Sequence, residues 1–203
     1  SAVNFYGEGI TAEEVTKFYE AKESPNPQKP LAFGINTKLV KENGQLVEKV
    51  YKSGGLYGDA IDKIIFWLEK AKGVAENEKQ ANALGLLIEY YKTGDLQTWA
   101  DYNVAWVEAT EGNIDYINSF IEVYNDPMGY TGSYETIVQI KDFDMSEKMS
   151  VVEKNVQWFE DNSPIMDDHK KDSVVGVTYK TVLVAGEAGD ASPSTPIGVN
   201  LPN

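Results

Sequence analysis

The sequence predicts an α+β protein that is mostly helical and carries a small antiparallel β-sheet. Up to about residue 112, apolar residues recur at helical spacing and the segments end at glycines. From residue 113 onward, β-branched and aromatic residues alternate with polar ones, as in strands. We therefore expect a mainly helical part at residues 1–112, with an N-terminal hairpin, and a mixed part at residues 113–203. The two parts are expected to form one compact unit, because 203 residues with 42% hydrophobic content can bury a core.

The N-terminal part begins with two local signals. Thr11 and Glu14 have the spacing of a capping box, which predicts a short helix to about Lys22. A proline-rich stretch at residues 23–30 then favours an extended linker or a turn. Asn43-Gly44 separates two alternating segments and suits the positive φ angles of a type I′ turn, so these segments are expected to form a hairpin.

Three amphipathic helices are expected next, each between a capping residue and a glycine. The predicted caps and stops are Asp59 and Gly73, Asn77 and Gly94, and Thr98 and Gly112. Consecutive helices with glycine stops are also typical of a tetratricopeptide array. No fixed period recurs in this chain, so the repeat interpretation is the less favoured one.

The second half is expected to alternate between strands and a helix. A first strand lies within residues 114–126, and Asp126, Pro127 and Gly129 suit positions i, i+1 and i+3 of a type I turn. The expected return strand is Ser133–Lys141, and a helix with its apolar face inward is expected at 146–160. A strand or a strand-to-helix segment is expected at 174–184, followed by a loop at 186–198 and a strand edge at 199–201.

Composition excludes several functions. The net charge is −14, so the chain lacks the basic excess that binding to a nucleic-acid backbone requires. One histidine and no cysteine cannot supply the usual ligands of a structural zinc site, and they argue against a self-contained catalytic zinc site. No apolar run approaches the ~20 residues of a membrane span. The lack of cysteine is compatible with a reducing compartment, so we expect a cytoplasmic protein that binds neither membrane nor nucleic acid.

The single histidine, His169, lies among Asp167, Asp168 and two lysines. An Asp-Asp-His run could indicate a metal ligand or a general base. A solvated charged loop is the favoured interpretation, because neighbouring loop side chains rarely converge on one point.

Glu122, Tyr124 and Glu135 form the most informative constellation. In a strand, residues i and i+2 point the same way, so Glu122 and Tyr124 are expected side by side, with Tyr116, Asn118 and Phe120 on the same face. A hairpin turn would bring Glu135 near Tyr124. Such a patch suits a cation such as a peptide α-amino group. A glycosidase-like carboxylate pair or an ordinary solvated face are the alternatives.

Two asparagines near the end of the sequence, Asn200 and Asn203, flank Pro202. Amide side chains both donate and accept hydrogen bonds, so they suit the backbone ends of a substrate. An exposed turn-rich loop is the alternative.

Several blocks of this sequence resemble the dipeptidyl-peptidase III family. They are INSFIEVYNDPMG at 117–129, GSYE at 132–135 and PIGVNLPN at 196–203. Residues 157–164 and 189–193 resemble the bacterial branch of the family, and the order of the blocks also matches.

The resemblance implies a fold and an activity. Members are two-lobed zinc exopeptidases that release dipeptides from the N-terminus of oligopeptides. One lobe carries the zinc motifs, and the other contains a small β-barrel that binds the peptide by strand addition. In the family the zinc motifs follow the last of these blocks, so this chain resembles part of the substrate-binding lobe.

The resemblance also implies roles for individual residues. Glu122 matches the glutamate that binds the free amine of the substrate, and Asn200 and Asn203 match asparagines that share this task. Tyr124 matches a catalytic tyrosine near the scissile carbonyl, and Glu135 matches a glutamate that lines the subsite. Ser119 stands where the family usually has glycine, on the face expected to be opposite Glu122.

The predicted function is therefore substrate binding in a zinc-dependent dipeptidyl-peptidase III-like enzyme. The parent protein would use zinc, whereas this chain alone would bind none and would be inactive. Its expected partners are the N-terminus of a peptide substrate and the zinc-binding lobe of the same protein. The alternative function is a non-catalytic acidic helical interaction domain.

Overall fold

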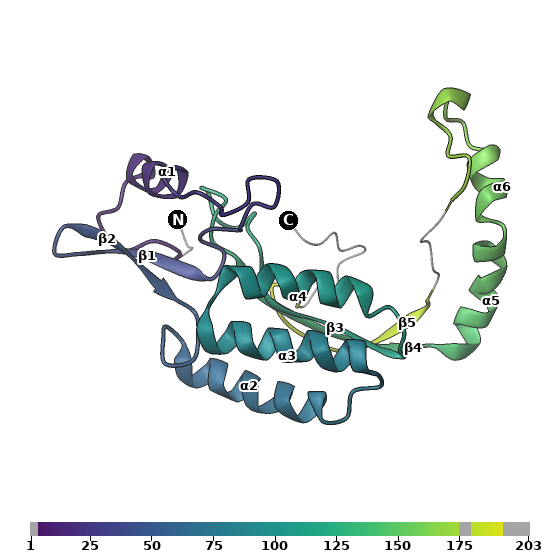
Figure 1. Cartoon of the computed structure of the whole chain (residues 1–203), viewed down its shortest axis with the longest axis horizontal. Helices are drawn as coiled ribbons and strands as arrows, with labels where there is room; N and C mark the ends of the chain where they lie inside the picture. Colours follow the sequence, from purple (N-terminus) through teal and green to yellow (C-terminus); the bar gives the residue numbers. More distant parts are fainter. Residues whose placement is uncertain (1–3, 175–179, 193–203) are drawn as a thin grey trace.

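The computed structural model describes residues 4–174 and 180–192 and shows an α+β fold (Figure 1). The helices are α1 (Ala12–Glu20), α2 (Gly58–Lys72), α3 (Glu78–Thr93), α4 (Leu96–Glu108), α5 (Phe143–Lys154) and α6 (Val156–Asp161), with a 3₁₀ turn η1 (Asp167–His169). The strands are β1 (Thr37–Glu42), β2 (Gln45–Val50), β3 (Ile114–Glu122), β4 (Ser133–Lys141) and β5 (Val182–Gly189). The α+β prediction is confirmed.

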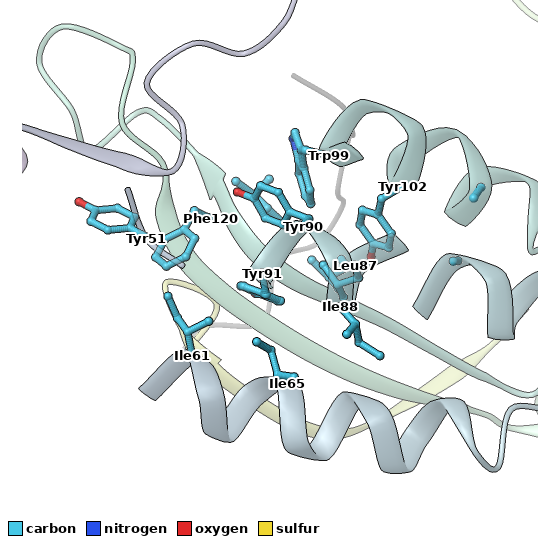
Figure 2. Close-up of a cluster of buried hydrophobic side chains, with 14 of the residues drawn as sticks. Tyr51, Ile61, Ile65, Leu87, Ile88, Tyr90, Tyr91, Trp99, Tyr102 and Phe120 are labelled. Atoms are coloured by element: carbon cyan, nitrogen blue, oxygen red, sulfur yellow. The ribbon is translucent and has the colours of Figure 1, made fainter. Parts of the chain in front are cut away.

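Helices α2, α3 and α4 lie side by side and pack against an antiparallel sheet of order β3-β4-β5 (Figure 1). The core between them is rich in aromatic residues (Figure 2). Tyr90, Trp99 and Tyr102 follow one another with ring centroids 5.0 and 5.3 Å apart. Leu87 and Tyr91 of α3 are fully buried at the centre. This helical layer gives the sheet a rigid support.

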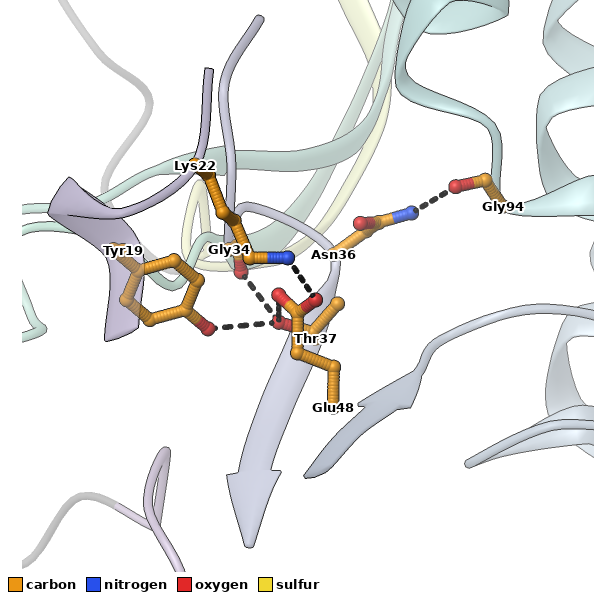
Figure 3. A network of polar contacts seen from close by, with 7 residues as sticks. All are labelled: Tyr19, Lys22, Gly34, Asn36, Thr37, Glu48 and Gly94. Atoms are coloured by element: carbon orange, nitrogen blue, oxygen red, sulfur yellow. Dashed lines mark hydrogen bonds and ion pairs between the residues drawn. The ribbon is translucent and has the colours of Figure 1, made fainter. Parts of the chain in front are cut away.

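A second, smaller core joins α1 to the β1-β2 hairpin, with Val15, Tyr19 and Leu39 at its centre. Thr37 connects the two elements, because its hydroxyl lies 3.2 Å from both the Tyr19 hydroxyl and a Glu48 carboxylate oxygen (Figure 3). Asn36 donates from Nδ2 to the carbonyl of Gly94 at 3.1 Å and so links this core to α3.

Most local signals of the first half are confirmed. The Thr11–Glu14 capping box is present, and Asn43 and Gly44 both have positive φ in the hairpin turn. Asn77 caps α3, and Gly94 ends it with φ 73°.

Two predicted caps are wrong. Helix α2 begins after Tyr57, which has φ 61° and makes no side-chain cap, so Asp59 lies inside the first turn. Helix α4 is capped by Asp95, whose carboxylate accepts from the Thr98 amide at 2.7 Å. Thr98 is therefore the third residue of that helix. The helix also ends at Glu108, before Gly112.

The segment after β4 differs most from expectation. The sequence predicts one helix at 146–160 with an inward apolar face, but the chain forms α5 and α6, interrupted at Asn155, as an arm that extends away from the sheet (Figure 1). Ser146 is the buried residue of α5, and Phe159 is half exposed. The last strand also runs further than expected, because β5 continues through Gly186 to Gly189. The strand edge predicted at 199–201 lies outside the described residues.

None of the helices in the described part of the chain is long and apolar enough to cross a membrane.

Candidate functional site

A β-bulge at the end of β3 determines the geometry of the candidate site. Phe120 lies opposite Tyr134, but Glu122 lies opposite Ser133, so the pairing register of the two strands shifts by one residue between Phe120 and Glu122. Directly opposed residues share a face, and neighbours along a strand alternate. Glu122 therefore lies on the face of Ser133 and Glu135, and Phe120 lies on the other. The expectation that strict alternation places Glu122 with Phe120 is wrong.

The same register corrects the position of Ser119. This residue lies directly opposite Glu135 and is completely buried. It therefore shares the face of both carboxylates and does not lie on the opposite face.

Glycine at position 132 permits the tight approach of backbones at the bulge. A Cβ on Gly132 would lie 2.9 Å from the carbonyl oxygen of Ile35 and 2.9 Å from the carbonyl carbon of Phe120. The Gly132 amide donates to that Ile35 oxygen at 2.9 Å. The bulge is thus fixed by a contact with a segment almost one hundred residues earlier.

Glu135 is a buried carboxyl group with only 4% of its surface exposed. Burial raises its pKa, and the nearby negative charges of Glu122 and Asp190 raise it further. None of the ion pairs found among the described residues includes Glu122, Glu135 or Asp190. The three carboxyl groups thus form a negatively charged group that no cationic side chain of the described residues balances.

The loop between β3 and β4 is held by the carboxylate of Asp126. The predicted turn is confirmed, because the Gly129 amide donates to the Asp126 carbonyl at 3.0 Å. The carboxylate also accepts from the amides of Tyr130 and Thr131 at 2.9 and 2.8 Å, and from the Tyr6 hydroxyl at 2.6 Å. These contacts fix the loop that carries Tyr124.

Tyr124 projects from this loop with 68% of its surface exposed. Its hydroxyl donates to Oδ2 of Asp190, and this hydrogen bond, with burial and the negative charges of Asp190, Glu122 and Glu135, raises the pKa of Tyr124 to about 12. The Nδ2 group of Asn125 donates to Oδ1 of Asp190 at 3.0 Å and to the Ser133 hydroxyl at 3.1 Å. Tyr124, Glu122 and Glu135 therefore lie close enough to interact, as the sequence predicts.

Sequence reasoning missed Asp190 as a member of this group. The residue follows Gly189, which ends β5 with φ 71°. The Asp190 amide donates to the carbonyl of Tyr134 at 2.8 Å, which turns the chain back toward β4. A Gly-Asp pair after an alternating segment is a turn signal, but this signal does not reveal that Asp190 faces a tyrosine 66 positions earlier.

Three other predicted positions lie away from this group or outside the described residues. Asn200 and Asn203 lie outside them. His169 is exposed at the end of η1, on the arm. Across residues 4–174 and 180–192, no three acidic or histidine side chains gather in a way that could hold a metal ion. The side chains in these two ranges therefore do not fit a zinc site.

Comparison with known proteins assigns the chain to a family. The model of peptidase family M49 matches residues 32–203. The chain belongs to peptidase family M49. Members of this family are generally zinc-dependent. The chain is 27% identical to dipeptidyl peptidase 3 of Homo sapiens and of Nematostella vectensis, over 73% of this chain in both cases. It spans about 20% of the length of each of these relatives.

Solved structures share the architecture. Dipeptidyl peptidase III from Caldithrix abyssi superposes with a TM-score of 0.76 at 25% identity, over 99% of this chain and 37% of that protein. The enzyme from Corallococcus sp. strain EGB superposes with a TM-score of 0.62 at 18% identity, over 93% of this chain and 34% of that one. The resemblance seen in the sequence motifs is therefore confirmed.

Proposed function

We propose that this chain is the substrate-binding part of a dipeptidyl-peptidase III-like enzyme and binds the free amino end of a peptide. The observation that carries the proposal is the buried Glu135 beside Glu122 and Asp190, without an ion pair in the described residues. Neighbouring carboxylates repel one another in the folded protein. A bound cation would relieve this repulsion.

A peptide α-ammonium group matches this environment in charge and in hydrogen bonding. With an ordinary pKa of about 7.7–8.0, the group is mostly protonated at neutral pH. Its N–H groups can donate to the carboxylates in charge-assisted hydrogen bonds, which are stronger than neutral ones. We assign Glu122 and Glu135 to this contact, and Asn200 and Asn203 to the remaining donors and acceptors of the peptide end.

Tyr124 is assigned to the carbonyl of the bond that is cleaved. A phenol is a hydrogen-bond donor that can stabilise negative charge as it develops on a carbonyl oxygen. A fixed distance between an amine-binding carboxylate and such a donor would select the second peptide bond from the amino end, which is the basis of dipeptide release.

The proposed enzyme extends beyond this chain. Zinc would be supplied by another part of the parent protein, and this chain alone would bind no zinc and cleave no peptide. This chain matches only about 20% of the length of its relatives named dipeptidyl peptidase 3, which supports this division. We further assign the protein to the cytoplasm, with peptides as substrates and without a role in nucleic-acid or membrane binding, because of its acidic charge and lack of cysteine.

The proposal is tested by titrating this chain with two forms of tetra-alanine, one with a free amino end and one acetylated, while NMR shifts are followed. The free peptide should move the resonances of Glu122 and Glu135, and acetylation should weaken binding by about tenfold or more, because it removes the charge. Glu122→Gln should weaken binding of the free peptide. Glu147→Gln, at an exposed position of α5, should not. Equal affinity for both peptide forms would overturn the proposal.

A further inference from the structure

Tyr124 lacks the packing that normally orders an aromatic side chain. More than two thirds of its surface is exposed, although its proposed task requires the hydroxyl to stand at a defined point. A free tyrosine on the surface samples several rotamers, and ordering it at the moment of binding costs affinity. Something other than burial must hold it in place.

Asp190 is the contact that holds it. One carboxylate oxygen accepts from the Tyr124 hydroxyl and the other accepts from Asn125, the next residue in the chain. Two adjacent residues of the β3-β4 loop are therefore tied to one carboxylate at the end of β5. Because these strands lie on opposite sides of β4, the contacts span the sheet.

Asp190 is itself held rigidly by the backbone. Its amide is bonded to the Tyr134 carbonyl, and the next residue, Ala191, is buried in the main core. The positive φ of Gly189 brings the carboxylate back over β4. Asp190 thus has the fixed geometry that a positioning residue needs.

We propose that Asp190 is a positioning residue that orients the Tyr124 phenol beside Glu122 and Glu135 before a peptide binds. This inference rests on the proposed function of Tyr124 in peptide binding and cleavage. Because the phenol has a single proton, Tyr124 can donate to only one acceptor at a time. When Tyr124 donates that proton in a hydrogen bond to a peptide carbonyl, it must release Asp190, whose carboxylate stays bound to Asn125.

The test compares Asp190→Ala, Asp190→Asn and Asp168→Asn. In Asp190→Asn, the side-chain oxygen can still accept from the Tyr124 hydroxyl. If the Asn125 amide flips, its oxygen can accept from the new side-chain NH2 group. Both contacts therefore remain, and only the negative charge is lost. Alanine removes both contacts. Asp168 is exposed on the arm, so its substitution controls for the loss of one negative charge.

Two NMR readouts on the free chain need no peptide. The order parameter of the Tyr124 ring should fall in Asp190→Ala and stay near the original value in Asp190→Asn and Asp168→Asn. The pKa of Tyr124, followed by its ring carbon, should fall from about 12 toward the ordinary value near 10 in Asp190→Ala, and by less in Asp190→Asn, which loses the charge but keeps the hydrogen bond. Unchanged ring order in Asp190→Ala would overturn the proposal. Resonances of the buried Tyr90 and Tyr91 report whether each variant remains folded.

A third readout connects the position of Tyr124 to binding. Asp190→Ala should weaken the affinity for tetra-alanine with a free amino end by about threefold to tenfold, the cost of ordering one side chain. Asp190→Asn should recover part of that loss, whereas an equal loss in both variants would mean that Asp190 acts by charge alone. If the unaltered chain binds no peptide, the proposed function fails, and ring order still decides whether Asp190 holds Tyr124.

Discussion

Glu122 and Glu135 share one face of the sheet because β3 contains one extra residue between Phe120 and Glu122. Without this bulge, Glu122 would lie opposite Gly132 and would point to the other face, away from Glu135. The bulge therefore creates the acidic pair. Bulges are common near functional sites because they redirect a side chain without altering the rest of the strand.

The first prediction concerns the electrostatic coupling of this pair. Removing the charge of Glu122 in Glu122→Gln should lower the pKa of Glu135, since repulsion from Glu122 contributes to its elevation. A titration of the Glu135 side-chain carboxyl carbon by NMR measures the change. Glu147→Gln should leave that titration unaltered, and a Glu135 pKa that does not respond to Glu122→Gln would show that the two carboxylates do not share a face.

The second prediction concerns the cost of keeping Glu135 ionised. Because the folded protein raises the pKa of Glu135, the folded state binds more protons than the unfolded state between the ordinary pKa and the raised one. Stability is therefore lost as the pH rises through this window. Glu135→Gln should increase the free energy of unfolding at pH 7 by a few tenths to about 1 kcal/mol, the range of cross-strand charge pairs.

Urea denaturation at pH 7 and at pH 4 checks this sign. At pH 4 Glu135 is already largely protonated in both states, so the stabilisation from Glu135→Gln should nearly vanish. Glu153→Gln, on the arm, serves as the matched control for loss of a negative charge. If Glu135→Gln instead makes the protein less stable than the parent at pH 7, the Glu135 carboxylate must have a favourable partner.

The third prediction concerns the turn that positions Asp190. Gly189 has φ 71°, and a Cβ there would lie 2.1 Å from the carbonyl oxygen of Tyr134. Gly129 has φ 74° with open space around it. Gly129→Ala should cost about 1–2 kcal/mol from the backbone alone, and Gly189→Ala about 2–5 kcal/mol, since overpacking adds to that cost.

Urea denaturation of both variants measures the difference, and the Tyr124 ring resonance shows whether Asp190 has moved. Equal costs for the two substitutions would show that the chain after β5 shifts freely to relieve the contact. In that case Asp190 would lack the rigid support that the backbone contacts give it.

Local signals in the sequence predicted much of the fold. Asn43-Gly44 and Gly94 were predicted correctly because a positive φ is a property of one or two residues. Strand β4 has the predicted bounds, Ser133–Lys141, since its apolar alternation is strong. These features depend only on residues that are adjacent in the sequence, so the sequence alone is enough to predict them.

The functional geometry depends on distant contacts and was predicted only in part. The bulge requires Gly132 to meet the backbone of Ile35, and Asp190 reaches Tyr124 across β4. Neither pairing has a local signature. The exposed apolar residues of α5 and α6 also misled the prediction of burial, because periodicity shows that a helix has an apolar face but does not show what covers it.

The last prediction concerns activity of the chain by itself. We expect that this chain, supplied with zinc, leaves a dipeptidyl-naphthylamide substrate uncleaved, because its described residues contain no group of side chains that could hold a metal ion. Fluorescence of released naphthylamine measures turnover, and a full-length dipeptidyl peptidase III serves as the positive control. Zinc-dependent turnover that persists at constant specific activity through repurification would contradict the prediction and would place a complete catalytic site within these 203 residues.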